Sequence, residues 1–132
     1  MFLITGWTAL VCGTFFMFLT RQVINARGTS KVSVGDGGDE VLLRRIRGQA
    51  NAAEQMPITL IVLGLAEGLG GSAWVLVPLA AIFTAGRISH GVAFGWLEKS
   101  LPLRFYGMLG SVLGTLGLLA YLGILLLMAS FG

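Results

Sequence analysis

Residues 47–57 read Arg47-Gly48-Gln49-Ala50-Asn51-Ala52-Ala53-Glu54-Gln55-Met56-Pro57, and this stretch decides how the rest of the chain is interpreted. At about 100° per residue of an α-helix, Arg47, Asn51 and Glu54 fall within about 60° of one another. Each ionisable side chain costs on the order of 3 kcal/mol or more at the centre of a bilayer. A cation, an amide and a carboxylate on one narrow stripe of an apolar chain therefore favour the wall of a polar binding site.

The composition around this stretch is that of an integral membrane protein. Hydrophobic residues make up 55% of the 132 residues and charged residues only 11%, whereas soluble domains carry about 25% charge. The net charge is +3, and no basic run alternates with aromatic residues, so we expect no nucleic-acid partner. Cys12 is the only cysteine, which excludes an intramolecular disulfide, and we expect it to be a buried, inert thiol.

Four stretches reach the length of about 20 residues that a helical span requires. We expect helices over about residues 1–26, 40–69, 72–97 and 103–130. The first stretch lacks the basic start and the cleavage site of a signal peptide, so we expect a retained helix. The predicted fold is all-α: one domain over residues 1–132, an integral membrane four-helix bundle.

The loop charges predict the orientation of this bundle. Five cations surround the first connection, namely Arg21, Arg27, Lys31, Arg44 and Arg45. Lys99 and Arg104 flank the third connection, while residues 68–72 and both termini carry no Lys or Arg. By the positive-inside rule, the first and third connections lie in the cytoplasm and both termini lie on the other side.

Two further patterns predict local structure. The segment Val34-Gly35-Asp36-Gly37-Gly38-Asp39 is typical of a tight turn, with Asp39 as the N-cap of the following helix. A phosphate-binding loop is the alternative, but no Lys-Ser/Thr pair follows the glycines. In the last helix, small residues recur three or four positions apart at Gly107, Gly110, Gly114 and Gly117. That stripe predicts close helix packing within or between subunits.

The polar residues leave more than one interpretation open. One is an internal Arg47–Glu54 ion pair that stabilises the bundle, with Asn51 bridging the two charged side chains. The other is a ligand site, for which the third helix offers Arg87 and His90 one turn apart. His90 has no second His or Cys at ligand spacing, so we expect no metal. The cations, carboxylate and amide together suit a small zwitterionic or polyanionic molecule at the cytoplasmic leaflet.

The quoted stretch resembles the signature R-x-Q-x-N-x-x-E-x-x-P of the MAPEG family, the membrane-associated proteins of eicosanoid and glutathione metabolism. Gln22-Val23-Ile24-Asn25-Ala26-Arg27 resembles the end of that family's first helix, and Gly86-Arg87-Ile88-Ser89-His90 its third. The turn before the signature resembles the bacterial branch. The resemblance covers essentially the whole chain.

The resemblance implies a homotrimer that binds glutathione between subunits near the cytoplasmic face. Arg47, Asn51 and Glu54 would hold glutathione from one subunit. Arg27 and Gln49 would reach in from the adjacent subunit, in keeping with Gln49 facing away from Arg47 on the helical wheel. Arg87 and His90 match third-helix positions that line the same pocket.

The resemblance also implies a reaction. Arg104 matches the arginine that stabilises the glutathione thiolate, and a nearby guanidinium favours the nucleophilic form of a thiol. The implied activity is a transferase or peroxidase of the bacterial inner membrane. Its co-substrate would be a lipophilic electrophile or lipid hydroperoxide, reaching the site laterally from the lipid.

Two departures from the family pattern keep an alternative open. Gln55 and Phe94 stand where many members have tyrosines, so two hydroxyls that would hydrogen-bond the peptide are absent. The alternative is a non-catalytic membrane protein that binds glutathione or an anionic lipid headgroup in the same pocket.

Overall fold

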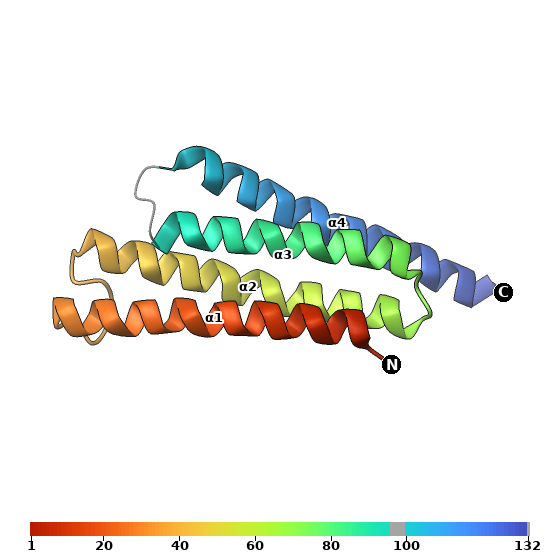
Figure 1. Cartoon of the computed structure of the whole chain (residues 1–132), viewed down its shortest axis with the longest axis horizontal. Coiled ribbons are helices and arrows are strands. Elements are labelled where there is room, and N and C mark those ends of the chain that lie inside the picture. Colours follow the sequence, from red (N-terminus) through yellow and green to blue (C-terminus); the bar gives the residue numbers. More distant parts are fainter. Residues whose placement is uncertain (96–99, 132) are drawn as a thin grey trace.

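The computed structural model describes residues 1–95 and 100–131, which form four α-helices (Figure 1). The helices are α1 (Leu3–Ser30), α2 (Glu40–Gly68), α3 (Ala73–Gly95) and α4 (Leu101–Phe131). Successive helices run in opposite directions. The α1–α2 connection therefore lies at one end, here called the polar end, and both termini lie at the other, the terminal end. The prediction of an all-helical, four-helix fold is confirmed.

The helix bounds differ from the expected ones by up to four residues. Helix α1 continues past residue 26 to Ser30, and it ends because Lys31 adopts a left-handed conformation (φ 54°) whose N–H bonds to the Arg27 carbonyl. Helix α4 begins at Leu101 rather than at residue 103. The expected end of the third helix at residue 97, and Lys99, lie outside the described residues.

The α1–α2 connection is the tight turn that its sequence predicts. Gly35, Gly37 and Gly38 have φ angles of 71°, 59° and 80°, which glycine adopts without steric cost. Asp39 caps α2 by accepting hydrogen bonds from the backbone N–H groups of Val41 and Leu42 at 2.9 and 3.0 Å. The Ser30 hydroxyl also donates to this carboxylate. These bonds, that from Ser30 foremost, hold the pKa of Asp39 below its usual value.

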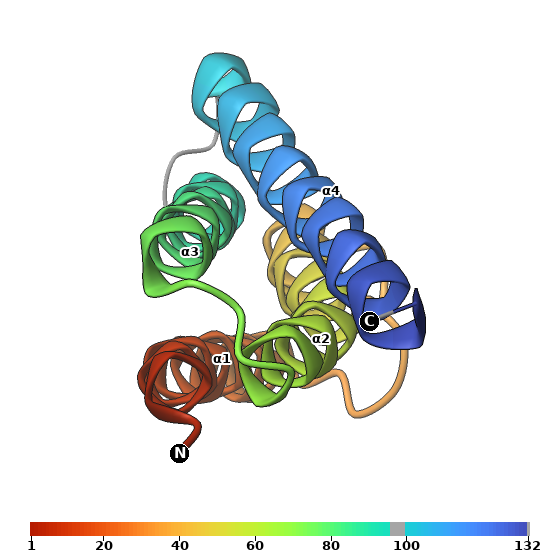
Figure 2. The same ribbon diagram turned by 90° about the vertical axis from the view of Figure 1, so that its right-hand side faces the viewer.

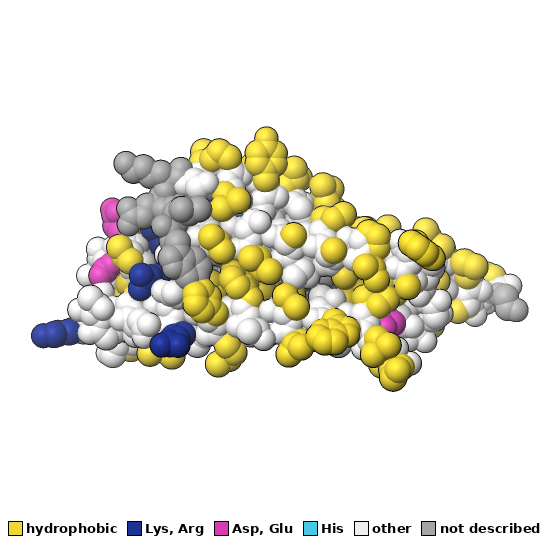
Figure 3. All heavy atoms as spheres, in the orientation of Figure 1, with side chains coloured by type: hydrophobic (Ala, Val, Ile, Leu, Met, Phe, Trp, Pro, Cys, Tyr) yellow, Lys and Arg dark blue, Asp and Glu magenta, His cyan; other side chains and the backbone are white. Residues whose placement is uncertain are grey.

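Among the described residues, three helices, α1, α3 and α4, are long and apolar enough to cross a membrane. Helix α2 is of similar length but does not qualify by composition, because charged and amide side chains lower the hydropathy of its first half. The prediction of four spans is thus supported for three helices. The Lys and Arg side chains visible in this view gather at the polar end, while hydrophobic side chains are spread along the rest of the face (Figure 3).

Glycines bring α3 and α4 into backbone contact. A Cβ placed on Gly107 would lie 2.7 Å from the His90 backbone nitrogen, and one on Gly86 would lie 2.5 Å from that of Ser111. A Cβ on Gly114 would lie 2.8 Å from the backbone nitrogen of Phe83. The prediction of close packing is confirmed within the chain. This contact determines which side chains of α3 and α4 lie next to each other.

At the terminal end, the Glu67 carboxylate of α2 binds the start of α1. It accepts hydrogen bonds from the N–H groups of Ile4 and Thr5 at 2.9 and 2.8 Å and from the Thr5 hydroxyl at 2.6 Å. A carboxylate at a helix N-terminus also interacts favourably with the helix dipole. Next to this contact, toward the polar end, the core is aliphatic, with Leu63, Leu76 and Leu118 fully buried.

Candidate functional site

A buried arginine ties three helices together in the half of the bundle nearer the polar end. Arg87 of α3 is only 2% exposed. Its Nε donates to the Ser111 hydroxyl of α4 at 2.6 Å, its Nη2 to the Met108 sulfur at 3.2 Å and its Nη1 to the Asn51 carbonyl of α2 at 3.3 Å. All three partners are neutral, so hydrogen bonds satisfy the guanidinium while its charge is not cancelled by them.

His90 extends this cluster by one turn of α3. It is 5% exposed, its Nδ1 lies 3.0 Å from the Arg104 carbonyl and its Nε2 lies 3.4 Å from the Asn51 amide nitrogen. A carbonyl only accepts, so the ring proton belongs on Nδ1 and Nε2 accepts from Asn51. This arrangement fits a neutral imidazole. We call Asn51, Arg87, His90, Met108 and Ser111 the polar node.

Arg104 lies at the edge of the polar node. Its guanidinium carbon sits 4.3 Å from the centre of the Phe94 ring, and that ring is 5.0 Å from the His90 ring. Cations are attracted to aromatic faces in this geometry. Arg104 and His90 also line a groove of about 540 Å³ together with Leu101, Pro102, Phe105, Tyr106 and Met108. The charged guanidinium of Arg104 therefore belongs to a residue that lines a largely apolar groove.

Arg47 and Glu54 are both exposed on α2. Within the described part of the chain, neither has a hydrogen-bond or ion-pair partner. The internal Arg47–Glu54 ion pair is therefore not formed in this chain. Asn51, between them on the same stripe, points inward to the polar node.

Gln49 and Arg27 lie away from this stripe. Gln49 donates from Nε2 to the Thr20 hydroxyl of α1 at 2.9 Å, so it faces α1 and not the side that Arg47 occupies. The Nη1 atom of Arg27 donates to three carbonyls of the α1–α2 connection, the shortest bond being to Gly35 at 2.9 Å. Within one chain, these two side chains have structural roles.

The sequence reasoning did not identify Ser111 and Met108 as part of the site. A signal was present, because Arg104, Gly107, Ser111 and Gly114 recur at spacings of three or four and so share one face of α4. Gln55, one of the two departures, points to α4, with its amide 3.9 Å from the Met108 sulfur.

Comparison with known proteins gives this arrangement a context. The family model described as MAPEG family matches residues 4–124, which is most of the chain. The chain belongs to the MAPEG family. The earlier resemblance is thereby confirmed, and the polar node is a feature of a MAPEG membrane protein.

Two curated relatives of this MAPEG chain come from bacteria. It is 25% identical over 119 residues to Inner membrane protein YecN of Escherichia coli strain K12, covering 86% of this chain and 91% of that protein. The protein of the same name from Escherichia coli O6:H1 strain CFT073 matches with the same values. These names place the relatives in the inner membrane and state no activity.

Proposed function

We propose that this MAPEG protein is a glutathione-dependent transferase or peroxidase of the bacterial inner membrane, acting on a lipophilic electrophile or a lipid hydroperoxide. The observation that carries the proposal is that Arg47 and Glu54 of α2 are exposed and have no partner among the described residues. Charges at membrane depth require partners. Glutathione carries carboxylates to pair with Arg47 and an ammonium group to pair with Glu54.

The other predicted residues support a site shared between copies of the chain. In one chain Gln49 binds Thr20 of α1 and Arg27 binds the α1–α2 connection, so we assign their contribution to the ligand to a neighbouring subunit. We therefore propose a homotrimer, with glutathione between subunits near the cytoplasmic face. Arg47, Asn51 and Glu54 would contact it from one side, and Arg87 and His90 would form the pocket floor.

Arg104 is the proposed catalytic residue. A free thiol has a pKa of about 8.5, and a nearby guanidinium stabilises the thiolate that acts as the nucleophile. With an aryl halide, the thiolate forms a carbon–sulfur bond, the halide leaves with the electron pair of its bond, and the thiol proton passes to water. The groove that Arg104 lines is largely apolar, which suits a lipophilic co-substrate.

The test measures binding and turnover separately. In mild detergent, glutathione should raise the unfolding temperature of the wild-type protein, and Glu54→Gln should abolish that shift. Glu40→Gln, which removes an exposed carboxylate from the first turn of the same helix, is the matched control and should leave the shift intact.

Turnover of a chromogenic aryl halide with glutathione should fall at least tenfold in Arg104→Ala, while the thermal shift remains. Arg21→Ala, an exposed arginine of α1, should turn over normally. Unchanged turnover in Arg104→Ala would remove this residue from the mechanism.

The second candidate is a non-catalytic protein that binds glutathione or an anionic lipid headgroup in the same pocket. Phe94 favours this function, because its ring packs on Arg104 and carries no hydroxyl to hydrogen-bond glutathione. Under this function, glutathione or anionic lipid raises the unfolding temperature, but no thiol is consumed with any co-substrate.

A further inference from the structure

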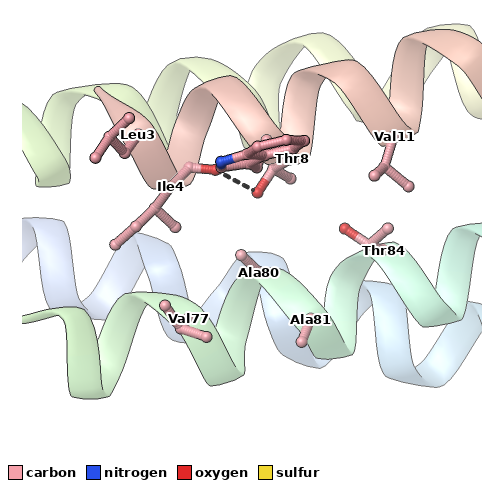
Figure 4. Close-up of a pocket in the computed structure, with 9 residues that line it drawn as sticks. Leu3, Ile4, Thr8, Val11, Val77, Ala80, Ala81 and Thr84 are labelled. Atoms are coloured by element: carbon pink, nitrogen blue, oxygen red, sulfur yellow. Dashed lines mark hydrogen bonds between the residues drawn. The ribbon is translucent and has the colours of Figure 1, made fainter. Parts of the chain in front are cut away.

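A second groove lies between α1 and α3 near the terminal end. It has a volume of about 460 Å³ and is lined from α1 by Leu3, Ile4, Trp7, Thr8 and Val11 and from α3 by Val77, Ala80, Ala81 and Thr84. Figure 4 shows Ile4, Thr8 and Val11 of α1 and Ala80 and Thr84 of α3 pointing toward the space between the two helices. Farther toward the polar end, outside the groove, the Phe15 ring of α1 lies close to Gly91 of α3.

The walls of this groove disfavour water. They are hydrocarbon except for the indole N–H of Trp7 and two hydroxyls, and the Thr8 hydroxyl already donates to the Ile4 carbonyl at 2.7 Å. The Thr84 hydroxyl lies 3.9 Å from the Cys12 sulfur. A buried water needs about three polar partners, which these walls do not supply. The occupant must therefore be apolar.

The rim of the groove disfavours a second protein helix. Membrane helices associate through small residues that allow the backbones to approach, whereas the α1 side of this rim carries Leu3, Trp7 and Val11. Trp7 is 68% exposed and Leu3 is 54% exposed. Such side chains hold a neighbouring helix away from the buried Ala80, but they leave room for a narrow, flexible chain.

Two tryptophans indicate where the groove lies in the membrane. Trp7 and Trp74, which is 91% exposed, both lie on the turns of α1 and α3 nearest the terminal end. Exposed tryptophans concentrate at the boundary between headgroups and hydrocarbon. From Leu3 to Val11, α1 rises about 12 Å, which is most of one leaflet of a hydrocarbon core of about 30 Å.

We propose that the groove between α1 and α3 binds one acyl chain of a phospholipid from the leaflet on the terminal side, with the headgroup beyond Leu3, at the terminal end of the groove. The chain fills a space that would otherwise leave the groove walls without contacts, since a void forfeits the dispersion attraction of its lining. This site goes beyond the proposed glutathione chemistry and does not depend on it.

The test uses the full chain in vesicles of phosphatidylethanolamine and phosphatidylglycerol with a trace of phosphatidylcholine that carries a diazirine on its acyl chain. After photolysis, label on residues 3–11 and 77–84 should exceed label on the exposed end of α4 at least threefold. Ala81→Leu fills the groove and should remove this excess. Ala85→Leu adds the same side chain at an exposed position of α3 outside the groove and should not.

Two results would overturn the proposal. One is equal labelling of the groove and of α4, which indicates bulk lipid only. The other is efficient disulfide crosslinking of two chains through Ala81→Cys, which indicates a second copy in the groove. The thermal unfolding of each variant reports whether it is folded. The glutathione-induced shift tests the proposed function independently, because no groove residue belongs to that site.

Discussion

Arg87 and Glu54 are charged residues in two different environments. Arg87 is enclosed and hydrogen-bonded by neutral groups, whereas Glu54 is exposed and has no partner within the described chain. The first arrangement is costly to disturb, because each group that loses its partner remains buried. The second leaves a group available for a ligand.

Ser111→Ala tests the cost of disturbing Arg87. The substitution removes the acceptor of the 2.6 Å bond from Nε, and leaving a buried donor unsatisfied costs about 1–3 kcal/mol. The free energy of unfolding in detergent micelles should fall by that amount. Ser130→Ala removes an exposed hydroxyl bonded only to the Leu126 carbonyl and should have little effect. Equal losses in both variants would contradict the role of Ser111.

Asp39 predicts a pH dependence outside the membrane-spanning segments. Its pKa is lowered in the folded chain, so its stabilising effect is complete above the unfolded value of about 3.9 and is lost as the pH falls through the folded value. At pH 7, Asp39→Asn should therefore unfold at a lower temperature than the wild type. At pH 3 the difference should shrink. A difference that stays constant from pH 7 to pH 3 would contradict the prediction.

At this scale, the sequence predicted the residue types but not all their partners. The spacing placed Arg47, Asn51 and Glu54 on one stripe, yet only Asn51 turns into the bundle, because side-chain length and rotamer decide which group reaches a neighbour. The N-cap at Asp39 was predictable, since it depends on local backbone groups alone. The Arg87–Ser111 bond joins residues 24 positions apart, so it required the relative placement of two helices.

Among the helices, α4 packs against α3 through only part of its glycine stripe. Cβ atoms at Gly107 and Gly114 would lie within 3.0 Å of α3 backbone atoms. At Gly110 the nearest atoms are 3.7 Å away, and at Gly117 the neighbour is the flexible end of Leu79. A pattern of small residues predicted close packing, but the exact crossing point of the helices decides which glycines need to be glycine.

Alanine substitutions should separate these positions. Gly107→Ala and Gly114→Ala force α3 and α4 apart, and overpacking of this kind costs about 1–3 kcal/mol. Gly110→Ala, on the same helix, should be nearly neutral. Unfolding of the purified variants in one detergent measures the difference. Equal stability of Gly107→Ala and Gly110→Ala would show that the two helices separate more readily than the structure indicates.

In the whole molecule, the two ends of the bundle differ in their content of Lys and Arg. Lys and Arg gather at the polar end (Figure 3), and the end-on view shows α1, α2 and α3 running side by side with α4 crossing them at an angle (Figure 2). Helix count and alternation followed from four long stretches separated by turns. The sequence did not reveal that α4 lies against α2 and α3 without contacting α1 among the described residues, because apolar helices carry little information about which neighbour they face.

The orientation in the membrane remains a prediction, and single cysteines can test it. The native Cys12 is only 1% exposed, so it contributes little background to labelling with a membrane-impermeant maleimide. Ser33→Cys lies in the α1–α2 connection and Ser72→Cys in the α2–α3 connection, and both side chains are exposed. Cations near a span are retained on the cytoplasmic side. In spheroplasts of a bacterial host, Ser72→Cys should therefore react at once, and Ser33→Cys only after the membrane is permeabilised. The reverse pattern would put the polar end, and with it the proposed glutathione site, on the periplasmic side.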